Sequence, residues 1–168
     1  MKTQKLAAID IGSNSIKLAI IEAAASDSFT VILQERERVR LGETLKLRFI
    51  PAEAIQKSAD AIAKFRSIAE SRNVNKIIAV ATASVREADN SNEFVEEIEK
   101  KTGVRVEVLS SIEEARLIGI ASVQNVGKQR GFLLNIDIGG GSTELSLMQD
   151  GYPDYLYSMK LGSVSLTN

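Results

Sequence analysis

The chain of 168 residues contains neither cysteine nor histidine, and this double absence restricts the chemistry that it can perform. Without cysteine no disulfide can form, and without both residues no thiolate or imidazole metal site can be built. Catalytic arrangements that pair a serine or cysteine nucleophile with a histidine base are excluded for the same reason. Any chemistry must therefore use carboxylates, hydroxyls, lysine, arginine, backbone amides and a hard cation.

An excess of charge of one sign and long apolar runs are also missing. The 21 Lys and Arg residues are balanced by 22 Asp and Glu residues, and this net charge of −1 argues against a nucleic-acid-binding protein. No apolar run reaches the roughly 18 residues that a membrane-spanning helix needs. Asp10 interrupts the apolar stretch that follows the basic N-terminus. We therefore predict a cytoplasmic protein that binds neither nucleic acid nor membrane.

Hydrophobic patterning predicts a layered α/β domain in the first three quarters of the chain. The predicted strands are 5–11, 16–21, 29–41, 76–81 and 104–109, and the predicted helices are 51–72, 90–102 and 110–124. A capping box of Asn90 and Glu93 begins the second helix, and either Ser110 with Glu113 or Ser111 with Glu114 begins the third. The order β-β-β-α-β-α-β-α predicts a mixed sheet with helices on its faces and an antiparallel meander at one side.

The sequence then repeats its opening pattern. Asp137-Ile138-Gly139 corresponds to Asp10-Ile11-Gly12, and each motif lies at the junction of a predicted hairpin. Strands are predicted at 132–138, 144–148 and 155–161, and the chain ends at Asn168 before any further helix. This internal duplication predicts a first domain at 1–126 and, at 127–168, the truncated beginning of a second domain of the same kind.

Each copy places a carboxylate and a polar, glycine-containing turn side by side. Backbone N–H groups exposed in such a turn can cradle phosphate oxygens. The candidate phosphate-binding residues are Gly12, Ser13, Asn14 and Ser15 in the first turn and Gly139, Gly140, Gly141, Ser142 and Thr143 in the second. Asp10 and Asp137 could hold a hydrated Mg²⁺ between two facing turns, because Mg²⁺ prefers carboxylate and phosphate oxygens. One such motif alone is more typical of a plain hairpin turn, but two copies in matching positions favour a binding site.

Two further motifs contribute candidates outside the turns. Arg86 follows the fourth strand and could make a forked contact with phosphate, although a solvated arginine is an equal alternative. Glu113 and Glu114 lie in the first turn of a predicted helix, where acids also favour the helix dipole. Neighbouring residues differ in direction by about 100° around a helix, so the two carboxylates cannot both cap it.

Together these motifs resemble those of the exopolyphosphatase/guanosine pentaphosphate phosphohydrolase (Ppx/GppA) family, within the superfamily of actin, sugar kinases and Hsp70 ATPases. The resemblance covers almost the whole chain, although family members are considerably longer. It implies an actin-like, ribonuclease H-like fold. The motifs that carry it are Asp10-Ile11-Gly12-Ser13-Asn14-Ser15, Ala81-Thr82-Ala83-Ser84-Val85-Arg86-Glu87-Ala88, Glu113-Glu114-Ala115-Arg116-Leu117 and Asp137-Ile138-Gly139-Gly140-Gly141-Ser142-Thr143-Glu144.

The resemblance also implies a reaction and a role for each candidate residue. The terminal phosphoanhydride of inorganic polyphosphate, or that of guanosine pentaphosphate, is hydrolysed to release orthophosphate. Glu114 is implied to be the general base, Glu144 to assist it or contact the metal, and Asp10 and Asp137 to bind Mg²⁺, with Mn²⁺ as an alternative. The two turns are implied to hold phosphate oxygens, and Arg86 to steady the chain behind them.

Other readings of the same sequence stay open. As a single piece with an unfinished second domain, the chain could bind phosphate or polyphosphate without catalysing its hydrolysis, and we expect little activity from it alone. A more distant alternative is an actin-like sugar kinase or ATPase. The exposed strand edge expected within residues 131–161 favours a homodimer.

Overall fold

A computed structural model describes residues 4–23, 29–127 and 130–167 of the chain. The chain forms two compact units, which divide between Val108 and Leu109. Each unit is built around its own sheet, with five strands in the first and three in the second. Among the described residues, no helix is both long enough and apolar enough to cross a membrane.

The five-stranded sheet of the first unit is mixed, as predicted. Its strands lie in the order β3-β2-β1-β4-β5. The antiparallel neighbours β1, β2 and β3 form the meander at one side, and β4 and β5 continue the sheet in parallel with β1. The strands are β1 (Gln4–Ile11), β2 (Ser15–Ala23), β3 (Phe29–Arg38), β4 (Lys76–Ala81) and β5 (Val106–Val108).

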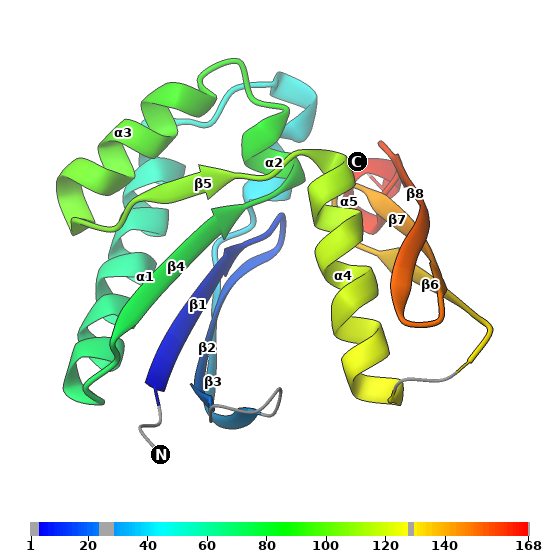
Figure 1. Cartoon of the computed structure of the whole chain (residues 1–168). Coiled ribbons are helices and arrows are strands. Elements are labelled where there is room, and N and C mark those ends of the chain that lie inside the picture. The colour runs from blue at the N-terminus through cyan, green and yellow to red at the C-terminus, as the bar shows by residue number, and fades with distance from the viewer. Residues whose placement is uncertain (1–3, 24–28, 128–129, 168) are drawn as a thin grey trace. The chain divides into compact units, whose positions relative to one another are not determined.

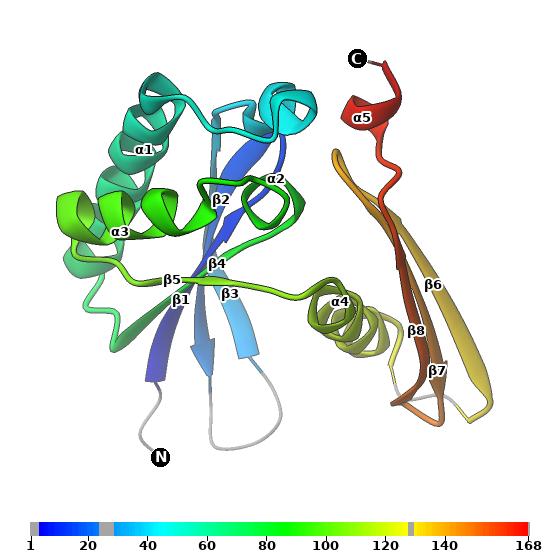
Figure 2. The same cartoon turned by 90° about the horizontal axis from the view of Figure 1, so that it is seen from above.

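One face of this sheet carries the core of the first unit. Side chains alternate between the two faces of a strand, and in β1 Ala7, Ile9 and Ile11 are buried while Asp10 points to the opposite face and is half-buried. Helices α1 (Ala52–Ser71) and α3 (Ser91–Thr102) cover the buried face and lie on the same side of the sheet (Figures 1 and 2). Phe65 of α1 and Phe94 of α3 are fully buried there.

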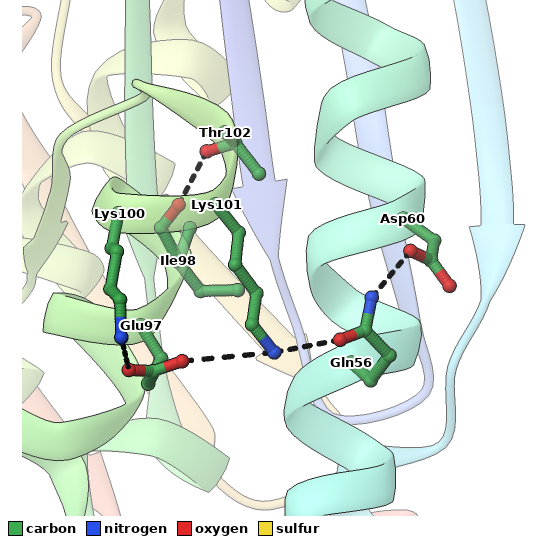
Figure 3. Close-up of polar contacts among 7 residues, drawn as sticks. All are labelled: Gln56, Asp60, Glu97, Ile98, Lys100, Lys101 and Thr102. Carbon is green, nitrogen blue, oxygen red and sulfur yellow. Dashed lines mark hydrogen bonds and ion pairs between the residues drawn. The ribbon is translucent and has the colours of Figure 1, made fainter.

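A polar network on the outer surface joins α1 to α3 (Figure 3). The Lys101 ammonium donates to Gln56 Oε1 at 2.7 Å, and the Gln56 amide nitrogen donates to Asp60 at 2.7 Å. Lys101 also lies 3.7 Å from Glu97, which pairs with Lys100 at 3.0 Å. Because this network is exposed, the buried aromatic and aliphatic residues beneath it contribute more to holding the helices together.

Tertiary contacts change several local predictions in the first unit. The third strand ends at Arg38, because Leu41 turns into the core and begins a 3-10 helix, η1 (Leu41–Leu47). The predicted capping box is wrong: Asn90 makes no capping bond, and its side-chain amide accepts from Ile50 N and donates to Ile50 O, both at 2.9 Å. A short helix, α2 (Ala83–Arg86), lies between the fourth predicted strand and the second predicted helix, where the sequence predicted no element.

The second unit is a three-stranded antiparallel sheet with one long helix on one face. The strands are β6 (Phe132–Ile138), β7 (Thr143–Gln149) and β8 (Tyr152–Met159), and the helices are α4 (Ser111–Val126) and the short α5 (Ser163–Thr167). Ser110 caps α4 through a bond from Glu113 N to its Oγ at 3.1 Å, which is the first of the two predicted alternatives.

The contacts of α4 group this helix with the second sheet, whereas the sequence predicted a domain boundary after residue 126. Gly119 explains the close approach of the helix to β7. A Cβ atom at that position would lie 2.7 Å from Met148 Sδ and 2.9 Å from Ser146 Cβ. The buried Ser146 hydroxyl also donates to Ala115 O at 2.7 Å.

Candidate active site

The first predicted phosphate turn, residues 12–15, joins β1 to β2 as a tight hairpin. Gly12 N donates to Ser15 O at 3.2 Å, directly after the last strand pair, Ile11 and Ile16. Ser13 and Ser15 are buried, and Asn14 at the tip is exposed. The turn is thus short, polar and held at its base by the sheet.

A buried serine from α2 connects this turn to a segment far away in the sequence. Ser84 Oγ donates to Ser13 Oγ at 2.7 Å, and only 2% of Ser84 is exposed. Thr82 N, just before α2, donates to Ile11 O at 3.2 Å. The turn therefore rests against the carboxyl end of β4, where ligand sites of open α/β sheets collect. Arg86 ends the same helix and lies 3.8 Å from Glu87.

The charged neighbours of the first turn lie on the face of the sheet opposite the core. Asp10 Oδ2 lies 3.8 Å from Lys17 Nζ on the paired strand. Arg36 of β3 donates from Nε to Ser15 Oγ at 3.0 Å. Asp10, Lys17 and Arg36 line an open hollow of about 600 Å³. Only the sheet register could have identified Arg36, because 21 residues separate it from Ser15.

The second predicted phosphate turn reproduces the first. Gly139 N donates to Ser142 O at 2.9 Å, directly after the strand pair formed by Ile138 and Thr143. Both turns thus contain four residues closed by a hydrogen bond of the same kind. Ser142 and Thr143 are buried, and Thr143 Oγ1 donates to Leu161 O at 2.5 Å. The duplication predicted from the sequence is therefore also a structural repeat.

Carboxylates flank this second turn on neighbouring strands. Asp137 is paired with Glu144, and Glu144 with Ser158, across β6, β7 and β8. Asp137 is exposed, whereas only 1% of Glu144 is, and the Ser158 hydroxyl donates to Glu144 Oε1 at 2.9 Å. Ser158 was not among the sequence candidates, because its position opposite Glu144 follows from the strand register alone.

The two acidic residues at the start of α4 have different surroundings. Glu113 accepts two bonds from the Arg116 guanidinium, at 2.8 and 2.7 Å, and its backbone N–H is capped by Ser110. The hydrogen bond from Arg116 holds the pKa of Glu113 below its ordinary value, and the same bond raises the pKa of Arg116. Glu114 is half-buried in the same helical turn, and its backbone N–H donates to Ser110 O at 3.0 Å.

The donor set of these residues suits Mg²⁺. Within the described part of the chain, no three Asp or Glu side chains form a complete metal cage. Mg²⁺ commonly uses one or two protein carboxylates and completes its shell with water and substrate phosphates. The cross-strand pair of Asp137 and Glu144 supplies two such carboxylates, and Asp10 supplies one beside the first turn.

The structure divides the predicted residues between the two units. Residues 10, 12–15 and 86 belong to the first unit, and residues 114, 137 and 139–144 belong to the second. The expectation that Asp10 and Asp137 face each other concerns both units and stays a prediction.

Comparisons with known proteins agree over nearly the whole chain. The family model of the Ppx/GppA phosphatase family matches residues 19–168. Exopolyphosphatase 1 of Mycobacterium leprae is 35% identical over 164 residues, which make up 97% of this chain and 48% of that protein. The chain therefore spans about half the length of the curated relatives that it matches.

Solved structures agree with this result. The crystal structure of an exopolyphosphatase from Cytophaga hutchinsonii matches with a TM-score of 0.91 and 30% identity, over 98% of this chain and 53% of that one. The Aquifex aeolicus member of the Ppx/GppA family matches with a TM-score of 0.86 and 29% identity, over 99% of this chain and 54% of that one. The predicted actin-like α/β fold is confirmed, and the chain belongs to the Ppx/GppA phosphatase family.

Proposed function

We propose that this chain takes part in hydrolysis of the terminal phosphoanhydride bond of inorganic polyphosphate, with release of orthophosphate. The observation that carries the proposal is the 35% identity with an exopolyphosphatase across 97% of the chain. The two repeated turns support it, because each combines a tight polar bend with a neighbouring carboxylate.

In this proposal the turns bind and orient the terminal phosphate. Phosphoryl transfer depends mainly on positioning and on neutralising charge at the phosphoryl oxygens. Apart from Gly12 N and Gly139 N, which close the turns, backbone N–H groups within residues 12–15 and 139–143 donate to those oxygens, and the Arg86 guanidinium adds positive charge behind them. These donors suit a chain without histidine, since none of them has to lose a proton.

Glu114 is the proposed general base that takes a proton from the attacking water. Its neighbour Glu113 is committed to Arg116 and to the helix cap, so the two carboxylates do not compete for one role. Glu144, held by Ser158, would assist Glu114 or share in binding the cation. Asp10 in the first unit, and Asp137 and Glu144 in the second, are the proposed ligands of Mg²⁺, or of Mn²⁺ in its place, which would neutralise phosphate charge when bound.

Phosphate release from polyphosphate in the presence of Mg²⁺ tests the proposal. Where the unmodified protein releases phosphate, Glu114→Gln is expected to reduce release at least about a hundredfold while tripolyphosphate still binds, since general-base catalysis contributes roughly 10²–10⁴-fold. Glu113→Gln is the matched control, with the same change one residue away and release expected within about threefold of the unmodified chain. Equal release from both variants would remove Glu114 from the mechanism.

The same protein preparation distinguishes the proposed function from two alternative functions. The family description covers both exopolyphosphatases and guanosine pentaphosphate phosphohydrolases, so guanosine pentaphosphate is assayed beside polyphosphate. The second alternative is a chain that binds phosphate or polyphosphate without turnover. Binding of tripolyphosphate without phosphate release from either substrate would support that alternative.

A further inference from the structure

We propose that a Leu-Gly segment after the third strand of each repeat positions the phosphate-binding turn. This holding segment donates backbone hydrogen bonds to carbonyl groups of the turn, on the side opposite the N–H groups that bind the anion. This inference rests on the proposed function, and it assigns to these segments a part in substrate binding. The first holding segment is residues 40–42, Arg-Leu-Gly, and the second is residues 161–165, Leu-Gly-Ser-Val-Ser. Neither segment belongs to the motifs that identify the candidate site.

In the first unit the holding segment donates two backbone bonds to the turn. Gly42 N donates to Ser13 O at 2.6 Å, and Arg40 N donates to Asn14 O at 3.0 Å. Leu41 between them is fully buried in the core, which fixes the backbone of the segment. Arg40 adopts the left-handed conformation, with φ of 61°, where the chain leaves β3.

In the second unit the corresponding segment donates three backbone bonds. Ser163 N donates to Gly139 O at 2.9 Å, and Val164 N and Ser165 N donate to Gly140 O at 2.9 and 3.1 Å. A search for such segments in the sequence alone would find only the shared Leu-Gly pair. Its meaning follows from the backbone bonds, which share one equivalent acceptor in the two turns, Ser13 O in the first and Gly140 O in the second.

Gly162 brings the second holding segment into direct contact with the turn. A Cβ atom on Gly162 would lie 2.4 Å from Gly140 O and 2.6 Å from Gly141 N. Both atoms belong to backbone, which cannot swing aside as a flexible side chain does. Glycine is therefore required at this position if the turn is to keep its conformation.

Peptide geometry determines the direction in which the N–H groups of the turn point. In a trans peptide group the C=O and the following N–H point in opposite directions. Because Gly139 O and Gly140 O accept bonds from the holding segment, the N–H groups of Gly140 and Gly141 point away from it. The bond to Ser13 O directs the N–H of Asn14 away from the first segment in the same manner.

The segments also reduce the entropic cost of binding. Three consecutive glycines have more conformational freedom than any other tripeptide, and ordering them on ligand binding would weaken affinity. The backbone bonds to Gly139 and Gly140 order the turn before the anion arrives. Loss of the holding contact should therefore cost more in the free energy of anion binding than in the free energy of unfolding of the unit.

Gly162→Ala tests the proposal, with sodium tripolyphosphate as the probe and amide NMR signals of the chain as the readout. We expect the dissociation constant to rise about tenfold, and the Gly140 and Gly141 amide signals to move already in the free protein. Gly119→Ala is the matched control, because its Cβ overlaps Met148 and Ser146 at the α4–β7 contact in the same unit. It should reduce stability and leave the dissociation constant within about twofold.

A milder variant covers the case in which Gly162→Ala does not fold. The Ser165 hydroxyl accepts from Gly162 N at 2.8 Å and donates to Gly162 O at 3.0 Å, so Ser165→Ala loosens the segment without a steric clash. We expect about threefold weaker binding, and Ser165→Thr, which keeps the hydroxyl, should restore it.

The outcomes separate this inference from the proposed function. If the unmodified chain binds no tripolyphosphate, the proposed function is contradicted, and unchanged Gly140 and Gly141 signals in the free variants would then overturn the holding role as well. If the unmodified chain binds, equal dissociation constants for it and the Gly162 and Ser165 variants would overturn the inference alone. Equal weakening by Gly119→Ala would also overturn it, since the effect would then be one of stability.

Discussion

At the scale of single residues, two buried hydroxyl groups connect distant parts of the first unit. Ser84 and Ser13 are separated by 71 positions in the sequence, and their oxygens lie 2.7 Å apart. A buried hydroxyl without a hydrogen-bond partner destabilises the folded state, because its desolvation is not compensated. Replacing either serine would therefore leave the other hydroxyl in that condition. The pair therefore links the stability of α2 to the shape of the first turn.

Ser84→Ala is expected to lower the free energy of unfolding by about 1–3 kcal/mol, because Ser13 Oγ is left without its donor inside the protein. Urea denaturation measures the change. Ser58→Ala is the control: Ser58 is equally buried, but its hydroxyl donates only to Ala54 O within α1, at 2.8 Å. A loss for Ser84→Ala no larger than that of the control would contradict the expectation.

The ion pair of Glu113 and Arg116 gives a pH-dependent prediction. Because the Arg116 hydrogen bond lowers the pKa of Glu113, the pair stabilises the start of α4 fully above the ordinary pKa of a glutamate. That contribution is lost as the pH falls through the lowered pKa. Carboxyl NMR titration should give a midpoint for Glu113 below the ordinary value, and Arg116→Gln should raise it. Identical midpoints in both proteins would show that the pair does not form in solution.

At the scale of elements, α1 is held by its buried stripe and not by its surface charges. Ile62 is fully buried, whereas Ile78 on β4 is 44% exposed, so the same truncation at the two positions isolates the effect of burial. Ile62→Ala is expected to cost about 2–5 kcal/mol, through lost apolar burial and a cavity. Ile78→Ala should cost about 1 kcal/mol or less. Chemical denaturation of both variants gives the comparison, and similar losses would contradict this account of the core.

Of the two helix caps predicted from local sequence, one forms and the other does not. Ser110 caps α4 as predicted, because the capping bond involves residues only three positions apart. Asn90 has the same kind of pattern, but its amide instead pairs with both backbone polar groups of Ile50, 40 positions away. A distant backbone that needs a buried partner can therefore outweigh a local capping signal.

At the scale of the whole molecule, the second sheet has one face covered by α4 and one that is apolar and exposed. Four alternate residues of β6, namely Phe132, Leu134, Ile136 and Ile138, are more than half exposed. Tyr155 and Tyr157 of β8 add aromatic surface through their register with β7. Exposed apolar surfaces of this kind favour association.

We expect the chain to self-associate through this face of the second sheet. Ile136→Lys places a charge within the row of exposed apolar residues on β6 without touching the side covered by α4, and should shift the protein toward the monomer in sedimentation velocity experiments. Glu107→Lys, an exposed charge change on the first sheet, serves as the control and should leave association unchanged. A monomeric unmodified chain at high concentration would contradict the prediction.

The amino-acid sequence by itself determined the permitted chemistry, the order of strands and long helices, the duplicated Asp-Ile-Gly turns and the family. These depend on composition and on patterns within a few neighbouring residues, such as the alternation of β1 and the helical stripe of α1. Only the tertiary structure decided that Ser84 contacts Ser13, that Ser158 holds Glu144, that α4 packs on the second sheet, and that Gly162 lies against the peptide of Gly140 and Gly141. The physical reason is that such contacts follow from sheet order and register, which depend on the burial of all strands and helices of a unit together and not on any one segment.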